Sequence, residues 1–122
     1  MKQTVAVLLL LVLLAGGIVW NALYINKVAN RLTALADGLP PIGDPACVPA
    51  AEALRSEWER AAARADLSVS YTLTDRVGEQ AALLASCAAS GDAFGYASAR
   101  SLFKDALRDL SRAEKFSFAA LF

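Results

Sequence analysis

An unbroken apolar run near the start of the chain is its dominant pattern. Residues 5–20 read VAVLLLLVLLAGGIVW without one polar side chain, and NALYI extends the run to Ile25. A helix over residues 5–25 would be about 31 Å long, which matches the hydrocarbon core of a bilayer. Trp20 and Tyr24 lie near its end, where aromatic residues gather at membrane interfaces. The pattern predicts a single-pass transmembrane anchor over residues 5–25.

A cleavable signal sequence is the alternative to a retained anchor. Secretory signals carry an apolar region of about 7–15 residues before a small-residue cleavage site, and residues 15–17 (Ala-Gly-Gly) would supply such a site. The apolar run continues past this site to Ile25, which favours a retained signal-anchor. Basic residues on both sides, Lys2 and Lys27, do not decide the orientation. We expect a short cytoplasmic N-terminus, residues 1–4, and the bulk of the chain extracytoplasmic.

Behind the anchor, small and apolar residues recur at helical spacing. Residues 26–46 predict a helical extension, with Val28, Leu32 and Leu35 on one face, that ends at Asp37 before a Pro/Gly linker. Three further stripes follow, in which residues three or four positions apart share a face. The stripes comprise Cys47, Ala51, Leu54, Trp58, Ala61 and Ala65, then Leu73, Val77, Gln80, Leu84 and Cys87, then Tyr96, Ala99, Phe103, Ala106, Leu110 and Ala113.

These stripes predict an all-α fold, in which the transmembrane helix is followed by a small antiparallel three-helix bundle over residues 47–115. Alanine, the best helix former, is abundant after residue 46, and β-branched residues are scarce beyond Thr74. Small residues allow helices to approach closely. We therefore expect a few large side chains, Trp58, Phe103 and Leu110, to anchor the core.

The chain ends in a second apolar segment, residues 116–122, which read FSFAALF. One interpretation is that this tail folds back to complete a thin core, since a small domain buries little apolar surface. The other is that the tail docks on another membrane protein or enters the bilayer interface. The residues of this candidate partner-docking tail are Phe116, Phe118, Leu121 and Phe122.

The chain contains two cysteines, Cys47 and Cys87. If the second and third predicted helices form a hairpin that turns near residue 67, both thiols meet at its open end. Outside the cytoplasm such a pair is expected to oxidise, so we predict a disulfide between them. Two buried free thiols are the alternative. Two sulfur ligands without a histidine leave a zinc site incomplete, and no C-x-x-C motif is present.

Composition and charge exclude several functional classes. Apart from Lys2, all Lys and Arg residues lie after the apolar run, 11 in number, against 12 Asp and Glu residues. This balance argues against nucleic-acid binding, which needs a surplus of basic residues. The chain has no histidine, which removes the commonest general base and the commonest neutral metal ligand. Because the carboxylates alternate with arginines on outward helix faces, we expect no enzymatic activity, cofactor or metal.

The order of these segments resembles that of a protein family. After the anchor come a helix with SEWERA, a D-R-V segment, and a final LFKDALRDLSRAEKFSFAALF. This order is similar to that of an uncharacterised family of small, singly anchored helical proteins, common in spore-forming Firmicutes and known as a domain of unknown function. Family members usually place a histidine before the third helix, and residues 71–74 supply none. The matching positions are Trp58, Asp75, Leu107, Leu110, Glu114 and residues 116–122.

The resemblance implies an accessory role beside a membrane protein and no known activity. Together with the anchor and the apolar tail, it favours a non-enzymatic, membrane-anchored extracytoplasmic helical module that interacts with another membrane or envelope protein. The expected partners are the lipid bilayer and another membrane protein, with no nucleic acid. The alternative is a secreted or anchored carrier that binds an apolar small molecule between its alanine-lined helices.

Overall fold

The computed structural model describes residues 1–64 and 71–121, with side chains except those of residues 18, 21, 64, 71 and 114–121. These ranges contain four helices and no strand, so the predicted all-α class is confirmed. The helices are α1 (Lys2–Asp37), α2 (Cys47–Arg64), α3 (Tyr71–Ser90) and α4 (Ala93–Leu121).

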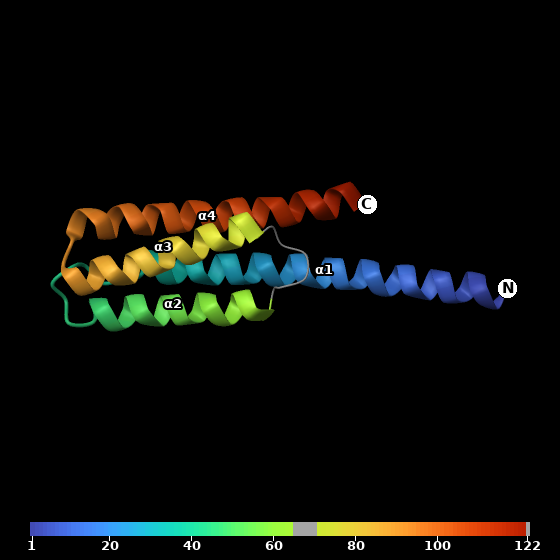
Figure 1. Ribbon diagram of the computed structural model, residues 1–122, viewed down its shortest axis with the longest axis horizontal. Helices are drawn as coiled ribbons and strands as arrows, with labels where there is room; N and C mark the ends of the chain where they lie inside the picture. Colours follow the sequence, from blue (N-terminus) through green and yellow to red (C-terminus); the bar gives the residue numbers. More distant parts are fainter. Residues whose placement is uncertain (65–70, 122) are drawn as a thin grey trace.

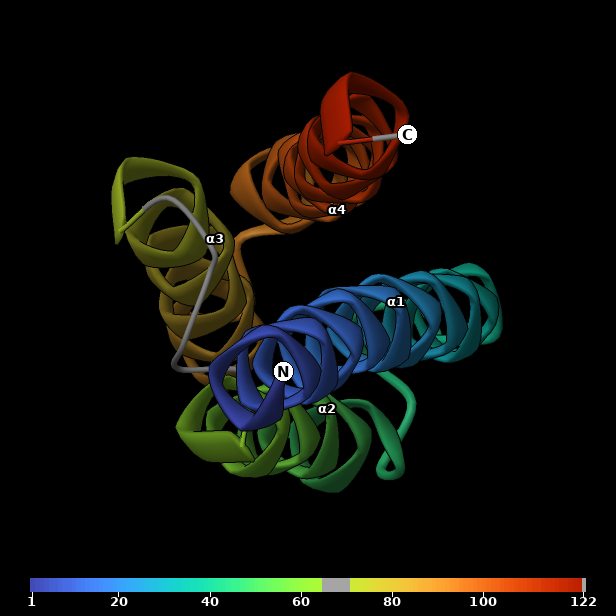
Figure 2. The ribbon, with the colours of Figure 1, turned by 90° about the vertical axis from the view of Figure 1, so that its right-hand side faces the viewer.

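The four helices surround a shared core. α1 contacts α2 and α4, and α3 contacts the same two neighbours. The chain reverses direction from each helix to the next (Figure 1), and the view along the helix axes shows all four helices around one centre (Figure 2). We call α2, α3, α4 and the C-terminal half of α1 the packed unit. It contains four helices in the described part of the chain, where the sequence pattern predicts three, because part of α1 joins the core.

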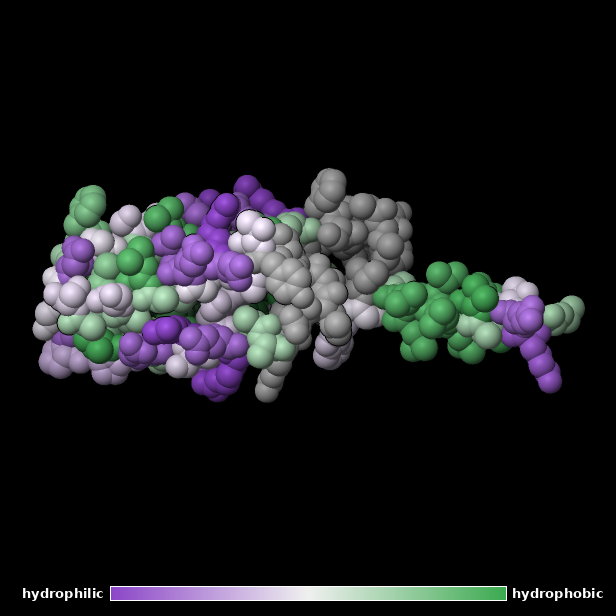
Figure 3. All heavy atoms as spheres, viewed as in Figure 1, coloured by the Kyte–Doolittle hydropathy of each residue, from purple (hydrophilic) through white to green (hydrophobic). Residues whose placement is uncertain are grey.

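The two halves of α1 lie in different surroundings. The N-terminal half projects beyond the other helices as a strongly apolar rod (Figures 1 and 3). The large side chains of residues 5–14 are between 56% and 71% exposed. Among the described residues, α1 is the one helix long and apolar enough to cross a membrane, and its most apolar window has no buried residue. We call the end of the packed unit from which this rod projects the proximal end, and the opposite end the distal end.

The C-terminal half of α1 packs through a stripe of alternating large and small residues. Ile25, Ala29, Leu32 and Ala36 are buried, with the spacing of a helix face that contacts two neighbours. The predicted stripe is wrong in part, because Leu35 is 42% exposed. The two alanines face inward instead, since small residues allow α1 to approach its neighbours closely.

Large side chains from α2, α3 and α4 fill the centre. Trp58, Phe103 and Leu110 are buried in one hydrophobic cluster with the α1 stripe. Trp58 packs against Gly78 of α3, where a Cβ would lie 3.3 Å from the indole Nε1. Glycine at this position lets α2 and α3 approach each other around the indole ring.

Two polar contacts align α1 with α4. Near the proximal end, Ser111 Oγ donates a hydrogen bond to Asn26 Oδ1 at 3.0 Å. Near the distal end, Lys104 forms an ion pair with Asp37, the last residue of α1. Because the two contacts lie at opposite ends of the packed half of α1, they fix the lengthwise register of the two helices.

Adjacent leucines on α3 provide a matched test of this core. Leu84 is fully buried, whereas Leu83 is 47% exposed. Leu84→Ala should lower the free energy of unfolding by about 2–5 kcal/mol because it leaves a cavity. Leu83→Ala should change it by less than about 1 kcal/mol. Urea unfolding of the full chain in detergent micelles, followed by far-ultraviolet circular dichroism, measures both. Equal losses from the two variants would contradict the assigned core face.

Candidate functional site

The predicted disulfide is wrong, because Cys47 and Cys87 are both free and buried. The two sulfurs contact different residues of the first turn of α4. Cys47 interacts with Tyr96 through a side-chain hydrogen bond, whereas Cys87 Sγ would lie 2.8 Å from a Cβ placed on Gly95. The cysteines therefore act as small core residues at the distal end, which is the free-thiol alternative.

Tyr96 connects three segments at the distal end. Its hydroxyl donates a hydrogen bond to the carbonyl oxygen of Pro40 at 2.8 Å, which fastens the linker after α1 to α4. Burial, followed by the hydrogen bond and charge interaction with Cys47, raises the pKa of Tyr96 to about 12, against a smaller opposing effect of Arg100. The phenol is therefore neutral at physiological pH, and the cluster is structural in character.

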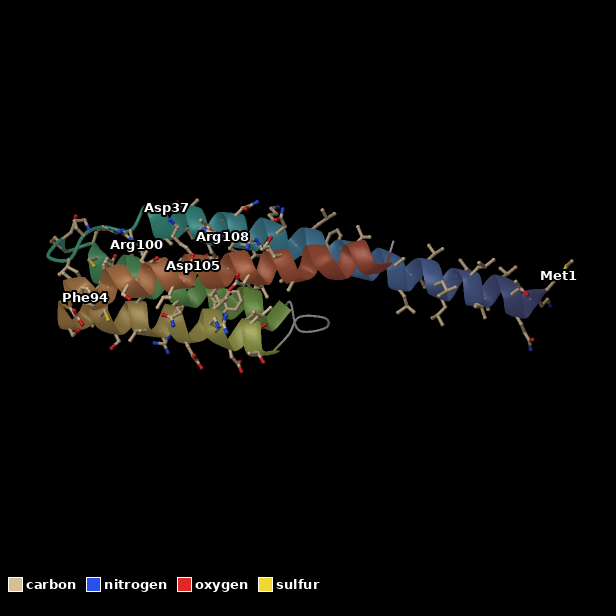
Figure 4. All side chains as sticks on the ribbon, turned by 90° about the horizontal axis from the view of Figure 1, so that it is seen from above. Met1, Asp37, Phe94, Arg100, Asp105 and Arg108 are labelled. Carbon is tan, nitrogen blue, oxygen red and sulfur yellow. The ribbon has the colours of Figure 1, made fainter. Side chains whose placement is uncertain are left out.

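Many of the charged residues form surface ion pairs. On α2, Arg55 Nε lies 3.3 Å from Glu59 Oε1. On α4, Arg108 Nη1 lies 3.7 Å from Asp105 Oδ1 (Figure 4). The described residues contain no group of three or more His, Cys, Asp or Glu side chains that would hold a metal ion. Exposed pairs of this kind contribute little to stability, typically less than about 1 kcal/mol each.

The apolar tail continues α4 and does not fold back. The backbone is helical to Leu121, so residues 116–121 extend the α4 axis past the ends of α2 and α3 (Figure 1). The expected completion of the core by this tail is therefore not seen along the described backbone. The side chains of Phe116, Phe118 and Leu121 lie outside the described part of the chain, as does Phe122.

The register of α1 and α4 places the tail beside the apolar rod. Ser111 lies next to Asn26, and α4 continues ten residues further, to Leu121. At 1.5 Å per residue this extension is about 15 Å long. Because α4 runs opposite to α1 (Figure 1), the extension runs beside the part of α1 that precedes Asn26.

A groove of about 330 Å³ lies between α1 and α2 at the proximal end. We call it the basic groove. In it, Glu57 Oε1 is 3.6 Å from Arg31 Nη2 of α1 and 3.6 Å from Arg60 Nη2 of α2. One half-buried carboxylate thus holds two exposed guanidinium groups from two helices. The groove is lined by Tyr24, Lys27, Val28, Arg31, Leu32, Glu57, Arg60 and Ala61.

A second groove, of about 280 Å³, lies on the other side of α1, against α4. We call it the polar groove. Its cations include Lys104, which pairs with Asp37, and Arg108, which pairs with Asp105. The polar groove is lined by Asn26, Ala29, Asn30, Thr33, Lys104, Leu107, Arg108, Ser111 and Arg112.

Sequence reasoning missed both grooves, because each joins residues from helices far apart in the chain. One signal was present: Lys27 and Arg31 directly follow the apolar run on one face of α1. The stripe pattern gives each helix its inward face, but it does not give which outward faces adjoin across a crevice. Arg60 on α2 reaches the same groove only through the packing of α1 against α2.

The chain matches no protein family, no curated protein and no solved structure in comparisons with known proteins. The geometry of the described residues therefore carries the functional argument.

Tyr96→Phe should change the pH dependence of stability. Between pH 10 and 12 the unfolded phenol ionises while the folded phenol keeps its proton, so the free energy of unfolding of the native chain should fall across this range. At neutral pH the free energy of unfolding of the variant should be lower by about 1 kcal/mol, because the hydrogen bond to Pro40 is lost. Above pH 10 the free energy of unfolding of the variant should fall less steeply than that of the native chain. Urea unfolding at a series of pH values tests this, with Tyr24→Phe as control. Parallel profiles for native and Tyr96→Phe chains would contradict the assignment.

Proposed function

We propose that the protein is a non-enzymatic, membrane-anchored helical module that binds another membrane protein. The observation that carries this proposal is the continuity of α1, whose exposed apolar half and packed half belong to one helix. A partner in the bilayer that contacts the rod is thereby connected to the packed unit without a flexible joint.

Membrane insertion is supported by the exposure of the rod. Leu13, Leu14 and Trp20 are 71%, 56% and 74% exposed, and apolar surface in water costs about 25 cal/mol per Å². Monomeric soluble proteins rarely expose an apolar patch that extends over several helical turns. In a bilayer, lipid would cover the part of this surface that no protein contacts.

The finer architecture and location belong to the same proposal. We infer that α1 is a retained signal-anchor, that the packed unit is an antiparallel bundle, and that this unit lies outside the cytoplasm in the cell membrane. The free thiols do not bear on the location, since buried cysteines behave as small apolar residues in either compartment.

The extension of α4 is the proposed docking element. With α1 inserted up to Ile25, the backbone register brings residues 116–121 beside the apolar rod, within the lipid. The sequence of this extension is suited to that place, since FSFAAL contains no charged residue. Two adjacent helices present a broader surface to a partner than a lone anchor does. An accessory role beside a membrane protein is also what the family resemblance implies.

The carrier alternative has weaker support. From the basic groove towards the distal end, the crevice between α1 and α2 continues as a largely apolar groove of about 320 Å³. It lies on the surface, so an apolar ligand there would keep part of its area in water, whereas ligand pockets usually bury about 70–90% of a ligand. This apolar groove is lined by Arg31, Leu35, Gly38, Leu39, Ala50, Ala53, Leu54 and Glu57.

Polar substitution of the tail should abolish partner binding without unfolding the protein. We expect a discrete crosslinked complex from native membranes containing the full chain, and its loss by at least about tenfold in Phe116→Ser/Phe118→Ser, because buried aromatic anchors dominate binding energy. Phe94→Ser is the matched control: Phe94 belongs to the same helix, is 87% exposed and lies at the distal end (Figure 4).

Two outcomes would contradict the docking proposal. One is a complex that persists in the tail variant, which would place the partner elsewhere on the molecule. The other is the absence of any specific complex in native membranes. Circular dichroism of each variant shows whether the helices remain formed, so a loss of binding through unfolding is recognised.

The orientation is tested with single cysteines in a Cys47→Ala/Cys87→Ala chain. A membrane-impermeant maleimide added to intact cells should label Phe94→Cys, because Phe94 is highly exposed at the distal end. Gln3→Cys, at the opposite end of α1, should react only after the cells are permeabilised. The reverse pattern would place the packed unit in the cytoplasm.

A further inference from the structure

We propose that the basic groove binds the phosphate headgroup of an anionic membrane lipid. This inference rests on the insertion of α1 proposed above, and it assigns a ligand to a site that the docking role does not use. The height of the groove, its charges and the composition of its lining support this assignment.

The height of the groove follows from the continuity of α1. If the apolar run ends at Ile25, then Lys27 lies about 3 Å and Arg31 about 9 Å beyond it along the same helix. The headgroup layer of a bilayer is about 5–7 Å thick on each side. Side chains on a helix lean towards its N-terminus, which on α1 is the direction of the lipid. Both cations therefore reach the level of the lipid phosphates.

The charges of the groove suit a singly charged phosphodiester. Lys27, Arg31 and Arg60 face one carboxylate, Glu57, which holds both guanidinium groups at 3.6 Å. The arginine side chains remain 67% and 71% exposed, so most of their N–H groups are open to a ligand. Lys27 has no ion pair among the described residues and is exposed. Arginine N–H groups match phosphate oxygens in geometry.

The lining also matches the amphipathic character of a lipid. The apolar side chains Val28, Leu32 and Ala61 lie beneath the charged groups, and Tyr24 lies at the membrane side of the groove. A volume of about 330 Å³ is within the usual range for small-ligand sites. A lipid whose chains stay in the bilayer brings its phosphate to this height, whereas a free phosphate must be captured from dilute solution. We therefore assign the lipid as the occupant.

The polar groove is a weaker candidate for the same ligand. Of its three cations, Lys104 pairs with Asp37 and Arg108 with Asp105, while Arg112 has no ion pair among the described residues. The polar groove thus has three cations and two paired carboxylates, whereas the basic groove has three cations and one carboxylate, Glu57. The net attraction for an anion is therefore concentrated between α1 and α2.

Competitive lipid retention tests the proposal. The full chain is released from micelles that contain equal amounts of phosphatidylglycerol and phosphatidylcholine, and the bound lipids are counted by native mass spectrometry. The native chain should retain phosphatidylglycerol preferentially. Since each basic residue near an anionic surface strengthens association about fivefold, Lys27→Gln/Arg60→Gln should weaken the preference by about 25-fold.

A matched variant separates the groove from overall charge. Arg55→Gln/Arg100→Gln also removes two positive charges, one from α2 and one from α4, at residues that do not line the basic groove. This variant should leave the preference within about twofold of the native chain. Equal losses in both double variants, or no preference in the native chain, would overturn the proposal.

Two further measurements distinguish the remaining outcomes. Glycerol 3-phosphate added in excess should leave the bound phosphatidylglycerol in place, and its complete displacement would assign the groove to free phosphate instead of lipid. Alkaline carbonate extraction of native membranes tests insertion separately. A chain that leaves the membrane on extraction refutes the anchoring in the proposed function, whereas an inserted chain without lipid preference refutes the groove alone.

Discussion

The uninterrupted backbone hydrogen bonding of α1, from Lys2 to Asp37, is the constraint on which the rest of the structure depends. A helix of this length keeps each residue at a fixed height and angle relative to the others. Once Ile25 is buried in the core, the position of every residue in the exposed rod follows. The same continuity means that the packed unit and the apolar rod have a single orientation, with no hinge between them.

Two contacts extend this constraint from α1 to α4. The hydrogen bond between Ser111 and Asn26 and the ion pair between Lys104 and Asp37 set the register. Their individual energies are small, because both are at least partly exposed. Their consequence is geometric, because α4 continues for ten residues past Ser111, to Leu121. Among the described helices, this extension runs past the ends of α2 and α3, on the side of the packed helices from which the rod projects (Figure 1).

The sequence predicts the helices well because each is encoded locally. Cys47, Leu54 and Trp58 on α2 lie at helical spacing, and all three are buried. The errors arise where packing between distant helices decides. Leu35 looks like a core residue by size, yet Ala36 is the buried neighbour, since small residues fit a close helix contact. The basic groove was equally unpredictable, because its cations come from two helices whose facing sides no local pattern records.

The two ends of the packed unit differ in a way that bears on where function resides. At the distal end, Cys47 and Cys87 are buried, and the Tyr96 hydroxyl donates a hydrogen bond to the Pro40 carbonyl oxygen. Polar groups satisfied within the protein have little left to offer a ligand. At the proximal end, Arg31 and Arg60 share one carboxylate and keep most of their surface exposed. The two guanidinium groups that share Glu57 therefore lie at the end of the packed unit from which the rod projects.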